Sequence, residues 1–128
     1  MNKFRFVSVF IVILASSCAS ISKPFYYNEI VVHNNTRDLI RDVEIRAEVS
    51  NRMFSCGNIA SNARCSNKFP QREYQNNLLS VIWVHNNIKR TKNNIKLEVP
   101  AQMDKSIPLR GVLALQEDGS IKVWLEQD

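Results

Sequence analysis

The chain has 128 residues, of which three are glycine and three are cysteine, and its formal net charge is +5 at pH 7. This length is typical of a single domain and excludes two separate hydrophobic cores. A basic excess of this size is typical of an ordinary solvated surface and does not indicate a nucleic-acid partner.

Residues 1–17 have the order of a bacterial secretory signal peptide. Lys3 and Arg5 form a short basic start, and the following residues 6–15 are almost wholly apolar. This run is too short to cross a bilayer, which takes about 20 apolar residues. Small residues then precede Cys18, which is where a cleavage site is expected.

The segment Ala15-Ser16-Ser17-Cys18 resembles the lipobox of bacterial lipoproteins, with Ala15 where that motif usually has Leu. The resemblance implies cleavage before Cys18 and lipid on its sulfur. Each buried methylene contributes about 0.8 kcal/mol, so several acyl chains would hold the protein on the membrane of the cell envelope. Ala19 follows the cysteine, which by resemblance implies the outer membrane in a host with two membranes. Ordinary cleavage at Ser17-Cys18-Ala19 is the alternative.

The other two cysteines, Cys56 and Cys65, form one pair in an exported chain. In an oxidising compartment a disulfide is expected, and a loop this short stabilises by about 2–3 kcal/mol. A redox or metal pair is the rival interpretation, but a metal site needs further ligands and the only histidines are His33 and His85. We therefore expect no metal and no cofactor.

Residues 18–27 are expected to form a tether, because Ser20, Ser22 and Pro24 disfavour a helix. The domain is then expected to span residues 28–128 and to consist of short strands, since the apolar residues alternate with period two. The expected strands are residues 29–33, 43–49, a short segment ending at Cys56, 65–69, 78–85, 88–99, 111–116 and 120–126.

Local signals place the connections between these strands. Residues 57–64 are expected to form a loop, and Pro70 is expected to end the strand before it. Asn86-Asn87 predicts a two-residue hairpin turn, because Asn tolerates positive φ. Asp118-Gly119 between two apolar runs predicts a second hairpin.

Seven to eight short strands in about a hundred residues favour an all-β fold, an antiparallel β-sandwich, with a small closed β-barrel as the alternative. The pattern resembles immunoglobulin-like and fibronectin-III-like envelope domains. The cysteines are too close in sequence to bridge two sheets across a core as in true immunoglobulin domains. A group of small uncharacterised envelope lipoproteins is also similar, which implies no known activity, through Cys56-Gly57-Asn58-Ile59, Cys65-Ser66, Phe69-Pro70, Tyr74 and Trp83.

Catalytic patterns are missing from the sequence. The two histidines lie on different expected strands, and neither has a carboxylate or nucleophile beside it in sequence. The three glycines do not form a phosphate-binding loop. The sequence therefore predicts a protein that is not an enzyme.

Four residues outside the expected core are candidates for binding. Trp83 alternates with apolar residues and is expected in the core, whereas Trp124 alternates with Lys122 and Glu126 and is expected on an exposed face. The candidates are Trp124 and Tyr74 as platforms for a glycan or protein, and Lys89 and Arg90 as part of a basic stretch on opposite faces of one strand.

These features together predict a membrane-anchored, non-catalytic envelope lipoprotein that binds another envelope protein as an accessory module. A lipoprotein that binds carbohydrate or peptidoglycan is the first alternative, and a small enzyme inhibitor is the second.

Overall fold

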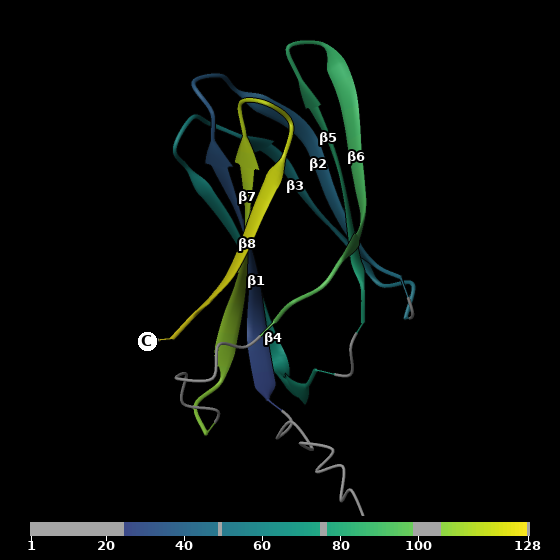
Figure 1. The fold of residues 1–128 in the computed structure, drawn as a ribbon, viewed down its shortest axis with the longest axis vertical. Coiled ribbons are helices and arrows are strands. Elements are labelled where there is room, and N and C mark those ends of the chain that lie inside the picture. The colour runs from purple at the N-terminus through teal and green to yellow at the C-terminus, as the bar shows by residue number, and fades with distance from the viewer. Residues whose placement is uncertain (1–24, 49, 75–76, 99–105, 128) are drawn as a thin grey trace, which may run out of the picture.

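The computed structural model describes residues 25–48, 50–74, 77–98 and 106–127, which form eight strands (Figure 1). No helix among these residues is long and apolar enough to cross a membrane. The strands are β1 (Tyr26–Asn35), β2 (Ile40–Ala47), β3 (Met53–Ile59), β4 (Arg64–Glu73), β5 (Leu79–His85), β6 (Ile88–Ile95), β7 (Leu109–Gln116) and β8 (Ile121–Glu126).

The strands form two packed sheets, one of order β4-β1-β7-β8 and one of order β3-β2-β5-β6. The predicted β-sandwich is confirmed, and the alternative of a closed barrel is wrong for the described strands, because each sheet has two free edges. One pair departs from the expected antiparallel arrangement. β1 and β7 run parallel along their whole length, as their arrows show in Figure 1.

The core lies between the sheets and is built by the predicted alternation. In β5, Leu79, Val81 and Trp83 are buried and the residues between them are partly exposed. In β2, Val43 and Ile45 are buried in the same way. The expected inward positions Val49 and Val99 lie outside the described residues, as does the segment 1–24 with Cys18.

Both predicted hairpin turns are present. Asn86 and Asn87 have φ of 52° and 63°, the pair of positive values that a two-residue turn between twisted strands requires. Gly119 has φ of 84° in the turn between β7 and β8. Its amide donates to the Gln116 carbonyl at 3.0 Å, which closes that turn.

The first strand begins earlier than expected. Tyr26 and Tyr27, which we assigned to the tether of residues 18–27, lie in β1. Phe25 and Tyr27 are buried in the core. Their burial removes large aromatic surfaces from water, so they belong to the folded domain.

β3 and β4 are also longer than expected, and the loop expected at residues 57–64 is shorter, because only residues 60–63 lie between the two strands. β3 continues through a bulge, where Val43 and Glu44 of β2 pair with Gly57 and Ser55 and leave Cys56 between them. Gly57 has φ of 61°, a value that suits glycine in a bulge. The bulge shifts the alternation by one residue, so both Cys56 and Ile59 reach the core.

Pro70 does not end β4, contrary to our expectation. The residue lies inside β4, an edge strand that pairs with β1 and with no other described strand. Between Lys68 and Arg72 the register with β1 shifts. A proline is tolerated at such an edge irregularity because no ladder hydrogen bond is lost.

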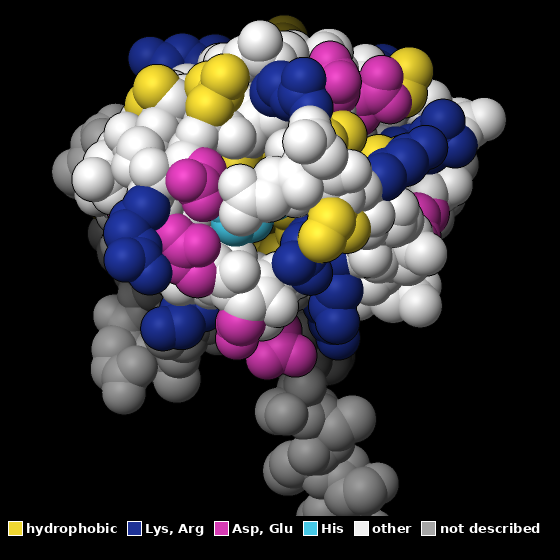
Figure 2. Space-filling view, turned by 90° about the horizontal axis from the view of Figure 1, so that it is seen from above, with side chains coloured by type: hydrophobic (Ala, Val, Ile, Leu, Met, Phe, Trp, Pro, Cys, Tyr) yellow, Lys and Arg dark blue, Asp and Glu magenta, His cyan; other side chains and the backbone are white. Residues whose placement is uncertain are grey.

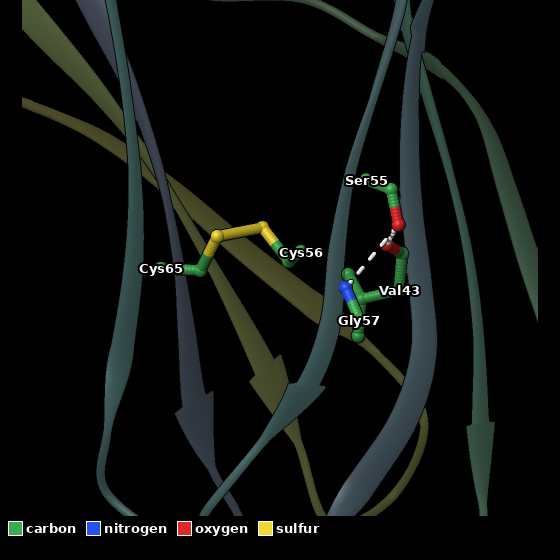
Figure 3. The surroundings of a disulfide bond; sticks show 5 residues. All are labelled: Val43, Ser55, Cys56, Gly57 and Cys65. Carbon is green, nitrogen blue, oxygen red and sulfur yellow. Dashed lines mark hydrogen bonds between the residues drawn. A yellow bond between two sulfur atoms is a disulfide. The ribbon is translucent and has the colours of Figure 1, made fainter.

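The predicted disulfide between Cys56 and Cys65 is confirmed, with a Cα–Cα distance of 5.9 Å (Figure 3). As expected for cysteines this close in sequence, the bond does not bridge the two sheets across the core as in true immunoglobulin domains. Cys56 lies on β3 and Cys65 on β4, so the bond joins the edges of the two sheets. The chain passes from β3 to β4 through a short turn at this edge, so a sequence separation of nine residues is enough for the two cysteines to meet. Ser55 steadies the bulge beside it by donating to the Val43 carbonyl and accepting from the Gly57 amide.

Candidate functional site

The outer face of the sheet β4-β1-β7-β8 carries buried apolar side chains, which is unusual for a face turned to solvent. Val31 of β1 and Val112 of β7 are paired in register and are almost wholly buried, although neither belongs to the core between the sheets. Trp124 of β8 pairs with Val112 and extends the same row to the sheet edge. The neighbouring row on this face is charged and consists of Lys68, Glu29, Arg110 and Glu126.

An ion pair on this face joins the two edge strands of the sheet, β4 and β8. Arg64 of β4 donates two hydrogen bonds of 3.1 Å to the two carboxylate oxygens of Glu126 on β8. Arg110 of β7 also approaches this carboxylate, with a separation of 3.8 Å. The bonds from Arg64, followed by the one from Trp124, hold the pKa of Glu126 below its usual range.

Trp124 lies on the face predicted from its alternation with Lys122 and Glu126. Its indole Nε1 donates to Glu126 Oε1 at 3.0 Å, which orients the ring while 36 % of the residue remains exposed. The adjacent Val123 is 37 % exposed on the opposite face of the same strand. None of the described strands lies beyond β8 in its sheet. Two neighbouring apolar side chains are therefore exposed along an open sheet edge, which we call the β8 edge.

Tyr74 does not form the exposed platform that we expected. Its side chain is buried, and its ring stacks on Phe25 with centroids 4.9 Å apart. The Tyr74 hydroxyl donates to the Asn77 carbonyl at 2.8 Å and accepts from the Leu97 amide at 3.1 Å. The residue fastens the chain segments that leave β4 and β6, a role that sequence position alone did not indicate.

Lys89 and Arg90 lie on β6, an edge strand, and point to opposite faces as expected. Lys89 is exposed, and Arg90 is partly buried. Arg90 pairs in register with Trp83 and reaches the β7–β8 turn, where its guanidinium lies against Gly119. The two side chains therefore do not form one basic patch.

Three connections meet at one end of the sandwich and bring together a histidine and two carboxylates. Figure 2 looks onto this end and shows histidine beside acidic side chains. His85 Nε2 lies 3.0 Å from Asp38 Oδ2 and 3.8 Å from Glu117 Oε2, and the histidine is buried. The bond from His85 is the main cause that lowers the pKa of Asp38. The sequence did not predict this cluster because its members are far apart along the chain.

Asn34 holds the connection that carries Asp38. The buried Asn34 side chain donates to the carbonyls of Asp38 at 2.8 Å and Ile59 at 2.9 Å, and it accepts from the Thr36 amide and hydroxyl. An Asn that bonds to backbone nearby in this way fixes a turn. Asp38 is therefore held rigidly beside the end of β5.

The same cluster is a set of three ligand atoms, all within 4.8 Å of one another, of types that bind zinc or manganese. Each carboxylate has another partner within the cluster or beside it. Asp38 accepts from His85, and Glu117 accepts from the Arg37 backbone amide and faces the Arg37 side chain at 3.6 Å. These hydrogen bonds and ion pairs link the three connections to one another.

No family model matches the chain, and no curated protein matches it. The chain is similar to a solved structure, the NMR structure of a protein from Eubacterium rectale, with a TM-score of 0.49 and 13 % sequence identity. The match covers 79 % of this chain and 89 % of that chain. A likeness of this degree carries no argument about function.

Proposed function

We propose that the chain is a membrane-anchored, non-catalytic envelope lipoprotein that binds another envelope protein through the β8 edge. The observation that carries this proposal is the exposure of the adjacent Val123 and Trp124 on β8, an edge strand that pairs with β7 on one side. An open strand offers a row of backbone donors and acceptors to a partner strand, and exposed apolar side chains beside it favour that pairing.

The surroundings of Trp124 support a binding role for it. Its indole is held by Glu126, which is in turn held by Arg64, so the ring does not need to be ordered when a partner arrives. Ordering a side chain costs affinity, and a preorganised aromatic residue avoids that cost. Tryptophan is also enriched among residues that dominate protein interfaces.

The membrane anchor is the part of the proposal that depends on Cys18. We expect Cys18→Ser to release the protein from membranes or to leave it as an uncleaved precursor, because the sulfur that takes the lipid is missing. Palmitate labelling followed by membrane fractionation measures this. Continued labelling, or a mature form that stays on the membrane, would contradict the lipoprotein assignment.

The partner interaction is tested by crosslinking and pull-down from membranes with two edge variants. Val123→Lys places a charge on the edge, and Trp124→Ala removes the anchor. Each should weaken capture, by about 30-fold or more if Trp124 dominates the interface. Ile88→Lys is the matched control, because Ile88 is 55 % exposed on the edge strand β6. Equal capture by the two β8 variants and wild type would refute the proposal.

A carbohydrate or peptidoglycan binder is the second candidate, and one observation bears on it. Trp124 offers an exposed indole, but the second platform, Tyr74, is buried. The glycan would therefore stack on a single ring. Sedimentation with purified peptidoglycan that is lost in Trp124→Ala, without any captured protein, would favour this candidate.

A further inference from the structure

The structure holds a cavity of about 320 Å³ at the end of the sandwich opposite the His85 cluster. It opens between the edge strands β3 and β4, on the side of the disulfide toward the start of β3. Ligand pockets usually measure about 300–1,000 Å³, so this one is of the size that takes a small ligand. Its walls include the core side chains Tyr27, Ile30, Phe54, Phe69 and Leu79.

Among the described residues, two arginines and no carboxylate lie at this apolar cavity. Arg52 and Arg72 line it, and none of its lining residues is Asp or Glu. Within the described part of the chain, neither guanidinium belongs to an ion pair. Both arginine charges act on the Tyr27 hydroxyl. Burial raises the pKa of Tyr27, and the positive charges of Arg72 and Arg52 oppose that rise.

Arg72 points between the sheets. It pairs in register with the buried Tyr27, and its guanidinium lies over the Phe69 ring, 5.1 Å from the centroid. Its Nε is buried and has no hydrogen-bond partner among the residues that the structure describes. A buried donor without a partner costs about 1–3 kcal/mol, so an acceptor placed beside it would recover a favourable interaction.

We propose that this cavity binds a single-chain fatty carboxylate, with its acyl chain among the apolar walls and its carboxylate on Arg72 and Arg52. The apolar walls fit methylene groups, and guanidinium groups are suited to carboxylates because they bind both oxygens. The volume lies at the low end of the ligand range, which favours one chain of medium length over a two-chain lipid. The site is separate from the β8 edge and does not depend on it.

The test is equilibrium dialysis of isotope-labelled decanoate against the whole chain in phosphatidylcholine nanodiscs, with empty nanodiscs as the blank. We expect saturable binding of one decanoate per chain. Decan-1-ol should bind at least tenfold more weakly, because it lacks the charge. Octanoate should bind more weakly by up to about fourfold for each methylene removed. No saturable binding, or equal binding of decanol and decanoate, would overturn the proposal.

Variants show whether the two arginines are responsible. Arg72→Gln should weaken decanoate binding about tenfold or more, in line with a hydrogen bond to a charged group. Arg52→Gln is the second variant, because Arg52 is exposed and its loss leaves the packed interior unchanged. Arg41→Gln on the exposed surface of β2 is the matched control and should bind as wild type does. Wild-type affinity in both cavity variants would overturn the proposal.

Two further measurements distinguish a fatty acid from a peptide or protein as the occupant of the cavity, and this site from the β8 edge. A photo-crosslinker in place of Met53, which is exposed at the cavity, should yield an adduct with the mass of a fatty acid. An adduct with a peptide or protein in its place would overturn the proposal. Trp124→Ala should leave decanoate binding unchanged, so a failure of this site and a failure of the β8 edge are distinguishable.

Discussion

Replacement of Trp83 tests the reasoning about the core most directly. Trp83 is 1 % exposed in the middle of β5, and its indole Nε1 is buried without a hydrogen-bond partner in the described part of the chain. Two opposing terms therefore act on this one side chain. The ring contributes by leaving water, and the unpaired N–H costs free energy.

The magnitudes of the two terms can be estimated separately. A tryptophan buries about 150–250 Å², which at about 25 cal/mol per Å² contributes about 4–6 kcal/mol. The unpaired N–H costs about 1–3 kcal/mol. The difference between the two terms is about 1–5 kcal/mol. The cavity left by Trp83→Ala adds to this loss, so we expect the free energy of unfolding to fall by about 3–5 kcal/mol. Trp83→Phe keeps a large ring and removes the N–H, so we expect a loss of less than about 1.5 kcal/mol.

The assay is urea unfolding followed by circular dichroism, because the substitutions remove a fluorophore. Trp124→Ala is the comparison, with an expected loss below about 1.5 kcal/mol since 36 % of that residue is exposed. Equal and large losses for Trp83→Ala and Trp124→Ala would refute the distinction between the two faces. A Trp83→Phe loss as large as that of Trp83→Ala would refute the argument about the unpaired N–H.

Two other predictions concern the edges of the sandwich. Cys56 and Cys65 should resist alkylation until reduced, and replacing both with Ala should cost about 2–3 kcal/mol, measured by denaturant unfolding; alkylation of native, unreduced protein would contradict this. Arg64 lowers the pKa of Glu126 in the folded chain. The ionised Glu126 carboxylate therefore stabilises the fold above its unfolded pKa of about 4.3, and this stabilisation is lost as the pH falls through the pKa of the folded state. Glu126→Gln should therefore be less stable than wild type at pH 7, and the difference in unfolding midpoint should shrink below about pH 4; a constant difference from pH 7 to pH 3 would show that Arg64 does not act through this charge.

Much of the fold could be predicted from the sequence, because the governing interactions are local. Alternation with period two placed β2 and β5 and assigned Trp83 to the core, since successive side chains of a strand point to opposite faces. The Asn86-Asn87 turn followed from the positive φ that asparagine tolerates. The disulfide followed from the pairing of Cys56 with Cys65.

The errors in the predicted strands arose where pairing between strands overrides local preference. Pro70 is accommodated in β4 because an edge strand has backbone groups with no partner to lose. Gly57 belongs to a bulge because β2 continues to pair on both sides of it. Neither the edge position nor the bulge can be identified from one strand by itself.

The sequence by itself determined the period of the strands, two hairpin turns, the disulfide pair and the faces of Trp83 and Trp124, all of which depend on residues close together in the chain. Only the tertiary structure decided which strands meet. It placed Cys56 and Cys65 on different sheets, buried Tyr74 against Phe25, and brought His85 to Asp38 and Glu117. Arg52 and Arg72 likewise reach one cavity from two strand ends. Such contacts depend on the order of strands in the two sheets, and the alternation that builds each strand is the same whichever neighbour it takes.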